Sequence, residues 1–343
     1  MSRLSAVLLI ALGLPQLAGC YAMQAARGQW SVMAKREPIQ EVIARPETPA
    51  TLKTSLATVL DVRRFATQEL GLPDNGSYRS YADIGRAYVV WNVFATPRFS
   101  IEPRRWCFPV AGCVAYRGYF AEKGARSFAQ RLEEDGLDVY VGGVAAYSTL
   151  GHFEDPVLNT MIGWSDVQLA AIIFHELSHQ LLYVPGDSSF NESFASVVEG
   201  EGVRRWLRAQ NREADLDAYR GQQRRYGQFV DLLIDTRQRL DQLYRSGVAE
   251  DEMQRAKEAT FAQLAEDHTR LKQQWGGRSA FDRWFASGVN NAHLVSVATY
   301  EECVTGIQAV LDAAGGDLQE FYARMRAIAE LDAEARRARL CVR

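Results

Sequence analysis

The sequence predicts an α+β protein, with a small sheet layer in its N-terminal half and a mostly helical C-terminal half. Two observations lead to this prediction. Between about residues 88 and 147, short runs rich in β-branched and aromatic side chains are typical of strands. From residue 165 onward, apolar side chains recur almost without interruption at the three- and four-residue spacing of helices. Strands in one half and helices in the other indicate the α+β class.

The composition excludes several classes of protein. The chain has 343 residues, of which 47% are hydrophobic and 24% charged, and this globular composition excludes a disordered, collagen-like or polytopic membrane protein. With 39 Lys and Arg against 42 Asp and Glu, the net charge is −3. Because no basic field is available to attract a polyanion, we expect no nucleic-acid partner.

Residues 1–19 have the features of a secretory signal peptide. A cation at Arg3 precedes an apolar run over 6–14, which is shorter than the about 20 residues that span a bilayer. Pro15 disfavours the alternative, a buried N-terminal helix. We therefore expect residues 1–19 to be removed from the mature protein.

The end of this segment predicts a lipid anchor. The sequence Leu17-Ala18-Gly19-Cys20 resembles the lipobox of bacterial lipoproteins, which implies cleavage before Cys20 and acylation of that cysteine. Tyr21 follows, where Asp would resemble an inner-membrane retention signal, so the outer membrane is favoured over the inner membrane. The folded body would then face the periplasm as a lipid-anchored membrane protein.

The next residues predict a tether and a first helix. Residues 20–50 contain several prolines and charges, which indicate a linker or an extended segment. Residues 51–70 have apolar side chains at helical spacing, and the glycines and proline within 71–76 predict a turn after them.

Strands are expected in three runs. These runs cover residues 87–96, 114–120 and 137–149, and a helix is expected over 121–136. Residues 51–164 would therefore form an α+β subdomain.

The remaining residues, 165–343, are expected to form a helical subdomain. The segment 211–274 is rich in Arg, Gln, Glu and Leu, and it predicts long amphipathic helices that break near Gly247. Its charges are most simply a solvated face, and we assign them no chemistry.

Four cysteines remain if Cys20 carries lipid, and an even number in an oxidising compartment permits two disulfides. Pairing of Cys107 with Cys113 and of Cys303 with Cys341 is one of three connectivities, and buried free thiols are an alternative. The absence of CxxC spacing gives no support to a zinc ribbon or a thioredoxin-like motif.

One predicted helix, over residues 165–183, combines a buried apolar face with polar residues. Ser165 and Gln168 have the spacing of a capping box, and Asp166 suits the positive end of the helix dipole. An apolar stripe consists of Ala170, Ile173, Phe174, Leu177 and Leu181. We therefore expect this helix to be buried.

Three polar residues within this helix form an HExxH pattern. His175 and His179 are four positions apart, so their imidazoles lie on one face and can hold one metal ion. Glu176 is rotated by about 100° from His175, so it can reach a water activated by the metal without being a ligand. This pattern predicts a catalytic Zn²⁺ site with Glu176 as general base; two satisfied core histidines are the alternative.

A catalytic zinc needs a third protein ligand. A turn at residues 184–187 precedes a second helix that begins near Ser188 or Ser189, and Glu192 lies near its start. An antiparallel return would bring Glu192 beside the histidines, so Glu192 is our third ligand. Glu199 lies on the same helix face and is the rival ligand or a partner that orients one; Ser196 also faces that way.

HExxH followed by a helix with Asn191-Glu192 resembles the gluzincin clan of metallopeptidases. The runs 106–120, 146–161 and 173–195 also resemble a bacterial family of predicted aminopeptidases that are lipoproteins or secreted proteins. The resemblance implies a zincin-like fold, peptide substrates and an edge strand that docks the substrate backbone, for which residues 144–150 would serve. Some gluzincins have Asp four residues after the glutamate ligand, where this chain has Ser196.

The oxyanion of the reaction needs a further hydrogen-bond donor. Tyr300 is our first candidate for this catalytic role, and His293, His152 and Tyr147 are alternatives. Two asparagines could line the cleft or could simply begin a helix, namely Asn290 and Asn291.

The predicted function is zinc-dependent peptide hydrolysis, with aminopeptidase implied by the family resemblance. An aminopeptidase needs carboxylates for the amino terminus of its substrate, and the nearby candidates in sequence are Glu154, Asp155, Glu199 and Glu201. A zinc endopeptidase and a non-catalytic lipoprotein scaffold or binding module are the alternatives. Glu176 distinguishes an enzyme from a scaffold, because a scaffold has no need for a carboxylate that is not a ligand.

Overall fold

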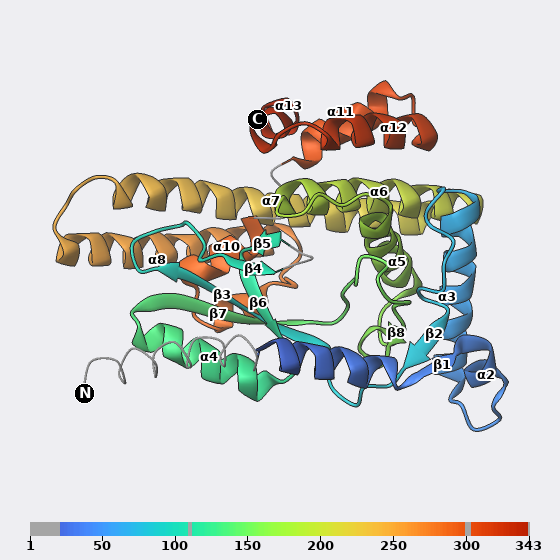
Figure 1. The fold of residues 1–343 in the computed structure, drawn as a ribbon. Coiled ribbons are helices and arrows are strands. Elements are labelled where there is room, and N and C mark those ends of the chain that lie inside the picture. Colours follow the sequence, from blue (N-terminus) through green and yellow to red (C-terminus); the bar gives the residue numbers. More distant parts are fainter. Residues whose placement is uncertain (1–20, 109–111, 299–302, 342–343) are drawn as a thin grey trace, which may run out of the picture.

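The computed structural model describes residues 21–108, 112–298 and 303–341. The expected signal peptide, Cys20 and Tyr300 lie outside the described residues. Within these ranges, no helix combines the length and the apolar character needed to cross a membrane. The fold is a mixed α+β architecture, as the sequence predicts, with small sheets in the first half and helices in the second (Figure 1).

The central sheet has three antiparallel strands in the order β6-β3-β7. These strands are β3 (Val90–Pro97), β6 (Tyr116–Tyr119) and β7 (Leu137–Val144), and they lie within the three predicted runs, β3 extending one residue past the first. Helix α4 (Glu122–Glu134) packs its small residues on the face that carries Val93 and Ala95. Residues on opposite faces of a strand alternate, so Phe94 points to the other face, where its ring stacks with Tyr140.

Two smaller sheets complete the strands. One contains β1 (Arg36–Pro38), β2 (Ser80–Ala82) and β8 (Val157–Leu158), with β2 antiparallel to β1 and parallel to β8. The 3₁₀ helix η1 (Asn159–Met161) follows β8.

The other small sheet is a hairpin of β4 (Trp106–Phe108) and β5 (Gly112–Val114), in which Cys107 faces Cys113 and is joined to it by a disulfide. Gly112 has φ +73°, and a Cβ there would lie 2.6 Å from the backbone nitrogen of Gly186. The hairpin therefore lies close against the loop before α6.

The largest apolar core lies among α3 (Ala50–Gln68), α5 (Asp166–Leu181) and α6 (Ser188–Ala209). Gly202 lets α6 approach α5 closely, because a Cβ there would lie 2.7 Å from the Phe174 ring. The same core contains residues from both halves of the chain, so the predicted sheet and helical subdomains share their interior.

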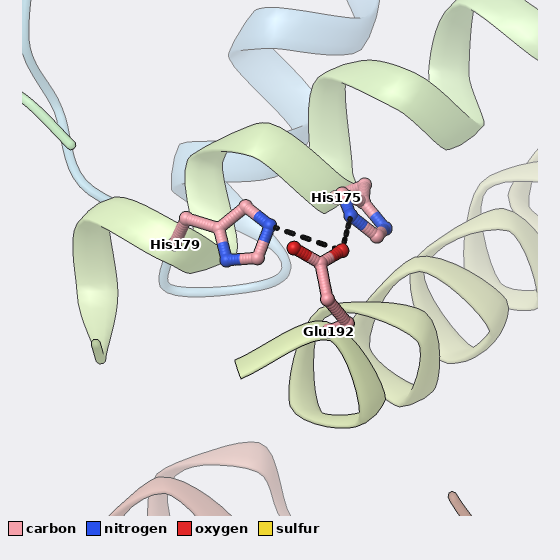
Figure 2. A group of neighbouring side chains, drawn as sticks. All are labelled: His175, His179 and Glu192. Carbon is pink, nitrogen blue, oxygen red and sulfur yellow. Dashed lines mark ion pairs between the residues drawn. The ribbon is translucent and has the colours of Figure 1, made fainter. Parts of the chain in front are cut away.

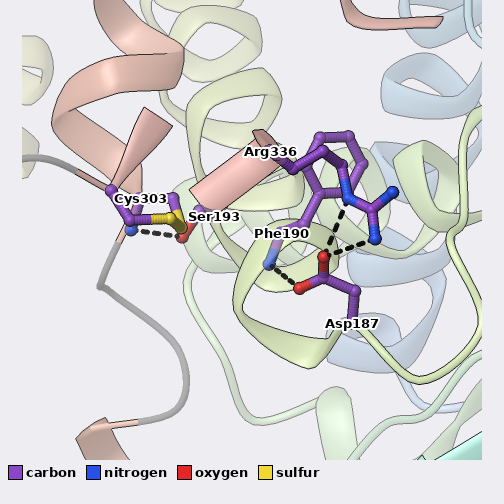
Figure 3. Close-up of a disulfide and its surroundings, with 6 residues drawn as sticks. Asp187, Phe190, Ser193, Cys303 and Arg336 are labelled. Atoms are coloured by element: carbon purple, nitrogen blue, oxygen red, sulfur yellow. Dashed lines mark hydrogen bonds and ion pairs between the residues drawn. A yellow bond between two sulfur atoms is a disulfide. The ribbon is translucent and has the colours of Figure 1, made fainter. Parts of the chain in front are cut away.

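Three C-terminal helices cover α6 (Figure 1). They are α11 (Val304–Ala313), α12 (Leu318–Ala329) and α13 (Ala333–Leu340). A disulfide joins Cys303 to Cys341, and the backbone N–H of Cys303 donates to the hydroxyl of Ser193 on α6 (Figure 3). The two disulfides follow the pairing of cysteines that are neighbours in sequence.

The predicted long helices are α7 (Glu213–Tyr244) and α8 (Glu250–Gln274), which form an antiparallel pair (Figure 1). Helix α7 ends before Gly247 and α8 begins after it, as the sequence predicts. Between them and the central sheet lies a separate apolar cluster that includes α9 (Asp282–Ala286) and α10 (Asn291–Ala298).

The prediction of a linker over residues 20–50 is wrong for the residues that the structure describes. Residues 21–33 are helical, and α2 (Ile39–Ala44) follows β1. Val32 and Ile39 are buried in the main core. Prolines indicate a linker only where they interrupt regular structure. Here Pro38 and Pro49 are the N-cap residues of α2 and α3, where the missing N–H costs little, so they are compatible with helices.

Candidate active site

Helix α5 begins where the sequence predicts. The hydroxyl of Ser165 accepts a hydrogen bond from the backbone N–H of Gln168 at 3.2 Å, and the Gln168 side chain accepts from the N–H of Ser165 at 3.0 Å. The predicted apolar stripe is confirmed, because four of its five residues are fully buried, namely Ala170, Ile173, Phe174 and Leu177, and the fifth, Leu181, is partly buried against the same core. Burial of this stripe fixes the rotation of the helix and turns His175 and His179 toward α6.

The return from α5 to α6 is fixed by two side chains. Asp187 is the N-cap of α6 and accepts a hydrogen bond from the N–H of Phe190 at 3.2 Å. The amide of Asn191 donates to the carbonyl of Val184 and accepts from its N–H, both at 2.8 Å. Because Glu192 directly follows Asn191, this double hydrogen bond sets its position opposite the histidines.

His175, His179 and Glu192 form one cluster (Figure 2). The Oε2 atom of Glu192 lies 3.3 Å from Nε2 of His175 and 3.8 Å from Nε2 of His179. One donor atom from each residue lies within 4.8 Å of the other two. Two donors on one tetrahedral zinc are roughly 3.3–3.6 Å apart, given bond lengths of about 2.0–2.2 Å. The donor types suit such an ion, and the distance between Glu192 and His175 lies in this range, whereas the other separations, of up to 4.8 Å, would have to shorten around it.

Charge and burial oppose one another in this cluster. Burial lowers the pKa of His175, but hydrogen bonds with Glu192 and Glu199 outweigh it and raise that pKa well above its usual value. Burial lowers the pKa of His179 to about 4. Burial raises the pKa of Glu192, but the hydrogen bond from His175 and the charges of both histidines outweigh it, so this pKa lies below its usual value. Without a metal, an ion pair between His175 and Glu192 holds the cluster together.

The second nitrogen of each histidine has a different environment. Nδ1 of His175 lies 3.1 Å from Oε2 of Glu199. Nδ1 of His179 is buried and has no hydrogen-bond partner among the described residues. Ser196, one turn after Glu192, makes no side-chain hydrogen bond within the described part of the chain and does not line the pocket described below.

Glu199 faces away from the metal-binding atoms, behind His175. Its Oε1 atom lies 3.2 Å from the hydroxyl of Tyr219 and 3.5 Å from the side-chain nitrogen of Gln223, which also donates to Tyr219 at 2.7 Å. Glu199 therefore contacts the ring nitrogen of His175 that faces away from Glu192, whereas Glu192 belongs to the group that could hold a metal ion. Tyr219 and Gln223 come from α7, and no local pattern in the sequence points to them.

Glu176 lies beside the cluster without belonging to it. The residue is 8% exposed and lines the same pocket as His175 and His179. Burial raises the pKa of Glu176 to about 7, the positive charge of His175 lowers it, and the charges of Glu192, Asp155 and Glu199 raise it further. A carboxylate in this position can exchange a proton with a group in the pocket.

The cluster forms part of the wall of a pocket of about 870 Å³. Most of the lining is apolar, and its aromatic side chains are Tyr21, Trp30, Phe94, Phe108, Tyr116, Phe120, Tyr147, Phe153 and Tyr183. One wall is the helix of residues 21–33, which the sequence did not predict. The pocket is large enough for several residues of a peptide.

Three of the candidates for the oxyanion donor lie within the described residues, and they differ in whether they line the pocket. His293 lies outside the pocket, where its ring packs on Tyr140 at 4.1 Å and bonds to Asn290 and Ser287, so its assignment to the site was wrong. His152 is exposed on the loop after β7. Tyr147 lines the pocket, and its hydroxyl donates to Gln29.

Asn290 and Asn291 also lie outside the pocket lining. Asn290 donates to the carbonyl of Val139, and Asn291 donates to the carbonyl of Arg98, so both fix α10 against the central sheet. Tyr116 also lines the pocket, although no pattern in the sequence points to it. Burial raises its pKa, and the charges of Glu192 and Glu176 raise it further.

The predicted docking strand over residues 144–150 is not a strand in the structure. β7 ends at Val144, and the residues after it line the pocket without pairing. The carbonyl of Ala145 accepts a hydrogen bond from Thr160, and Leu150 has φ +56°. The carbonyl of Ala145 is therefore already engaged, and the extended backbone ends at Leu150 at the latest.

The carboxylates considered for the amino terminus of a substrate all lie elsewhere. Glu201 pairs with Arg204 and Arg205. Glu154 is exposed, and Asp155 is buried and accepts hydrogen bonds from the backbone and hydroxyl of Thr149. Among the described lining residues, the acidic ones are Glu176 and Glu192.

The fold and the site together define a class of protein. It is an α+β protein in which two histidines and a glutamate, a group that could hold a metal ion, lie in the wall of a large apolar pocket. The profile of the family described as "Putative aminopeptidase" matches residues 20–340, so the chain belongs to this family. No curated protein and no solved structure matches it.

Proposed function

We propose that this chain is a zinc-dependent peptidase of the gluzincin type, with a zincin-like arrangement of its active helix. The observation that carries the proposal is the cluster of His175, His179 and Glu192, whose donor atoms lie within 4.8 Å of one another beside the buried Glu176. Membership of a family described as aminopeptidases supports peptide hydrolysis as the reaction.

In this proposal, Zn²⁺ supplies Lewis acidity that polarises the scissile carbonyl and makes the attacking water more acidic. His175, His179 and Glu192 hold the ion, and Glu199 keeps the ring of His175 oriented. Glu176 takes the proton from the attacking water and passes it to the leaving amine. The apolar lining excludes water from the remainder of the pocket and binds the side chains of the substrate.

The carboxylate of Glu176 supports an enzyme over a scaffold. It is buried and lines the same pocket, and it is not among the residues whose donor atoms lie close together. Keeping an extra carboxylate in an apolar environment is costly, so a scaffold would gain from an apolar residue there. The described residues offer no other use for it.

Aminopeptidase is the first candidate for the mode of cleavage, and it rests on the family description. One observation favours an endopeptidase as the second candidate. The described pocket lining has no acidic residue besides Glu176 and Glu192, which would be engaged in the reaction, to bind a free amino terminus.

The sequence also supports a location. The lipobox ending at Cys20 supports a lipid anchor on a membrane that faces the periplasm, with the outer membrane favoured. Two disulfides are compatible with an oxidising compartment.

Hydrolysis assays with and without metal test the function. Removal of metal by a chelator should abolish cleavage, and one equivalent of Zn²⁺ should restore it. Amino-acid arylamides and internally quenched peptides with blocked amino termini should be compared in the same preparation. Cleavage of arylamides alone supports the aminopeptidase, cleavage of blocked peptides supports the endopeptidase, and failure of zinc-loaded protein on both contradicts a peptidase.

A further inference from the structure

Exposed apolar side chains gather at the mouth of the pocket. Among the described residues, four large hydrophobic side chains are strongly exposed, and three of them are Met23 (71%), Trp30 (74%) and Phe153 (50%). Trp30 and Phe153 also line the pocket. Single exposed apolar residues need no explanation, but three on neighbouring segments mark an interaction surface.

Met23 and Trp30 belong to one face of the helix of residues 21–33. They are seven positions apart, with Arg27 between them at helical spacing, and all three are exposed. The opposite face is packed against the protein, since a Cβ at Gly28 would overlap the ring of Phe120. The helix is therefore held in place by one face and leaves the other unpartnered.

The charge of this segment has one sign. Residues 21–36 contain Arg27, Lys35 and Arg36 and no acidic residue. Lys35 donates to the carbonyl of Asp83, whereas Arg27 is exposed without a side-chain bond within the described chain. Methionine, tryptophan and arginine on one exposed helix face are typical of a helix that lies in a membrane interface.

The loop that carries Phe153 is attached to β1, which begins three residues after this helix ends. Arg36, the first residue of β1, donates to the carbonyl of Glu154 at 3.0 Å. This bond holds the loop near the end of the helix, and Trp30 and Phe153 line the same pocket.

We propose that the surface formed by Met23, Arg27, Trp30 and Phe153 rests on a lipid bilayer that contains anionic headgroups. A bilayer is favoured over another protein because the helix begins one residue after Cys20, the cysteine of the lipobox. The inference thus rests on the lipid anchor proposed above. The acyl chains hold the start of the helix at the membrane, and the exposed face lays the rest of it along the surface.

This contact sets the orientation of the pocket opening relative to the membrane. Trp30 and Phe153 belong both to the pocket lining and to the membrane-contacting surface, so the pocket opens toward the bilayer. Peptide substrates would then be taken from the membrane surface, which suits the apolar lining.

A spin label measures the position of the helix relative to the membrane. Ala34 follows Trp30 by one turn on the same exposed face and is 14 residues from Cys20, about 20 Å along a helix, so a lipid tether alone does not place it at the bilayer. Ala309 is the matched control, because it is an exposed alanine of α11, which lies on the opposite side of the molecule (Figure 1).

Full-length Ala34→Cys and Ala309→Cys proteins, purified from membranes and labelled with a nitroxide, would be reconstituted into vesicles of phosphatidylethanolamine and phosphatidylglycerol. Collisions with a water-soluble nickel chelate should be several-fold fewer for the label at 34 than for the label at 309. Equal collision rates would overturn the proposal. Dipolar broadening at 34 alone would also overturn it, since a second copy would then cover the face.

A charge-reversal variant gives a second readout. In the Ala34→Cys protein, Met23→Glu with Arg27→Glu should raise nickel collisions toward the value at 309. Hydrolysis of a soluble peptide should stay unchanged, because neither residue lines the pocket. Collision rates that do not respond to the double substitution would contradict the proposed contact. Both readouts are independent of zinc and of activity, so they distinguish this inference from failure of the proposed function.

Discussion

The Nδ1 atom of His175 lies 3.1 Å from the Oε2 atom of Glu199, while Nε2 of the same ring lies 3.3 Å from Glu192. One imidazole is thus held between two carboxylates. In the proposed function, Glu192 is a metal ligand and Glu199 orients the ring through its other nitrogen.

Glu199→Gln should weaken zinc binding without abolishing it. The amide keeps a hydrogen-bonding oxygen but loses the charge that makes the imidazole a stronger ligand, and such changes cost about 10–100-fold in metal affinity. Competition with a chromogenic chelator measures the affinity. Glu192→Ala is the comparison and should leave the protein without bound zinc after dialysis. If Glu199→Gln loses the metal and Glu192→Ala retains it, the two assignments are reversed.

Tyr116→Phe should lower kcat while zinc stays bound. Tyr116 lines the same pocket as Glu176 and Glu192, and a hydroxyl there can donate to the oxyanion. Loss of one such donor costs about 10²–10³-fold in kcat. Tyr119→Phe on the same strand is the control, because Tyr119 packs in the cluster under α4. Equal activity of the two variants would exclude Tyr116 as the donor.

Arg336→Ala should destabilise the fold. Arg336 is buried and pairs with Asp187, the N-cap of α6, at 2.9 Å (Figure 3). Removing one partner of a buried pair should lower the free energy of unfolding by about 2–4 kcal/mol. Urea unfolding measures this change. Arg324→Ala, which breaks an exposed pair with Glu320, should cost less than about 0.5 kcal/mol.

The contribution of Asp155 to the stability of the fold should fall as the pH rises from about 4 to 7. Burial raises the pKa of Asp155 to about 6 in the folded protein, against about 3.9 in an unfolded chain. The folded state therefore binds this proton more tightly, so its stabilising effect is complete below pH 4 and is lost as the pH passes 6. The loss is on the order of 3 kcal/mol.

Urea unfolding of Asp155→Asn across this pH range checks the assignment. The unfolding free energy of the original chain minus that of the variant should fall as the pH rises across this range, because the amide of the variant does not titrate. Asp312→Asn, at an exposed position of α11, should keep the slope of the original chain. A slope that is the same in all three proteins would show that Asp155 does not cause it.

The sequence predicted those features that depend on local spacing. The capping box at Ser165, the start of α6 and the long pair α7 and α8 are all properties of short windows. The placement of Glu192 opposite His175 also follows from a short turn between two helices.

Features that depend on distant segments were not predictable in this way. Tyr219 and Gln223 contact Glu199 from another helix. The helix of residues 21–33 forms a pocket wall because it packs against distant residues such as Phe120. His293 resembled a candidate donor in sequence, but its contacts with Tyr140 and Asn290 place it away from the pocket.

In the proposed mechanism, Glu176 performs chemistry beside a zinc ion that it does not bind. Glu176→Gln separates these two roles, and zinc content and peptide hydrolysis should be measured on the same preparation. We expect near-stoichiometric zinc with hydrolysis reduced by at least about 10²-fold, the scale of a lost general base. Hydrolysis at the original rate in a zinc-loaded Glu176→Gln protein would contradict the mechanism.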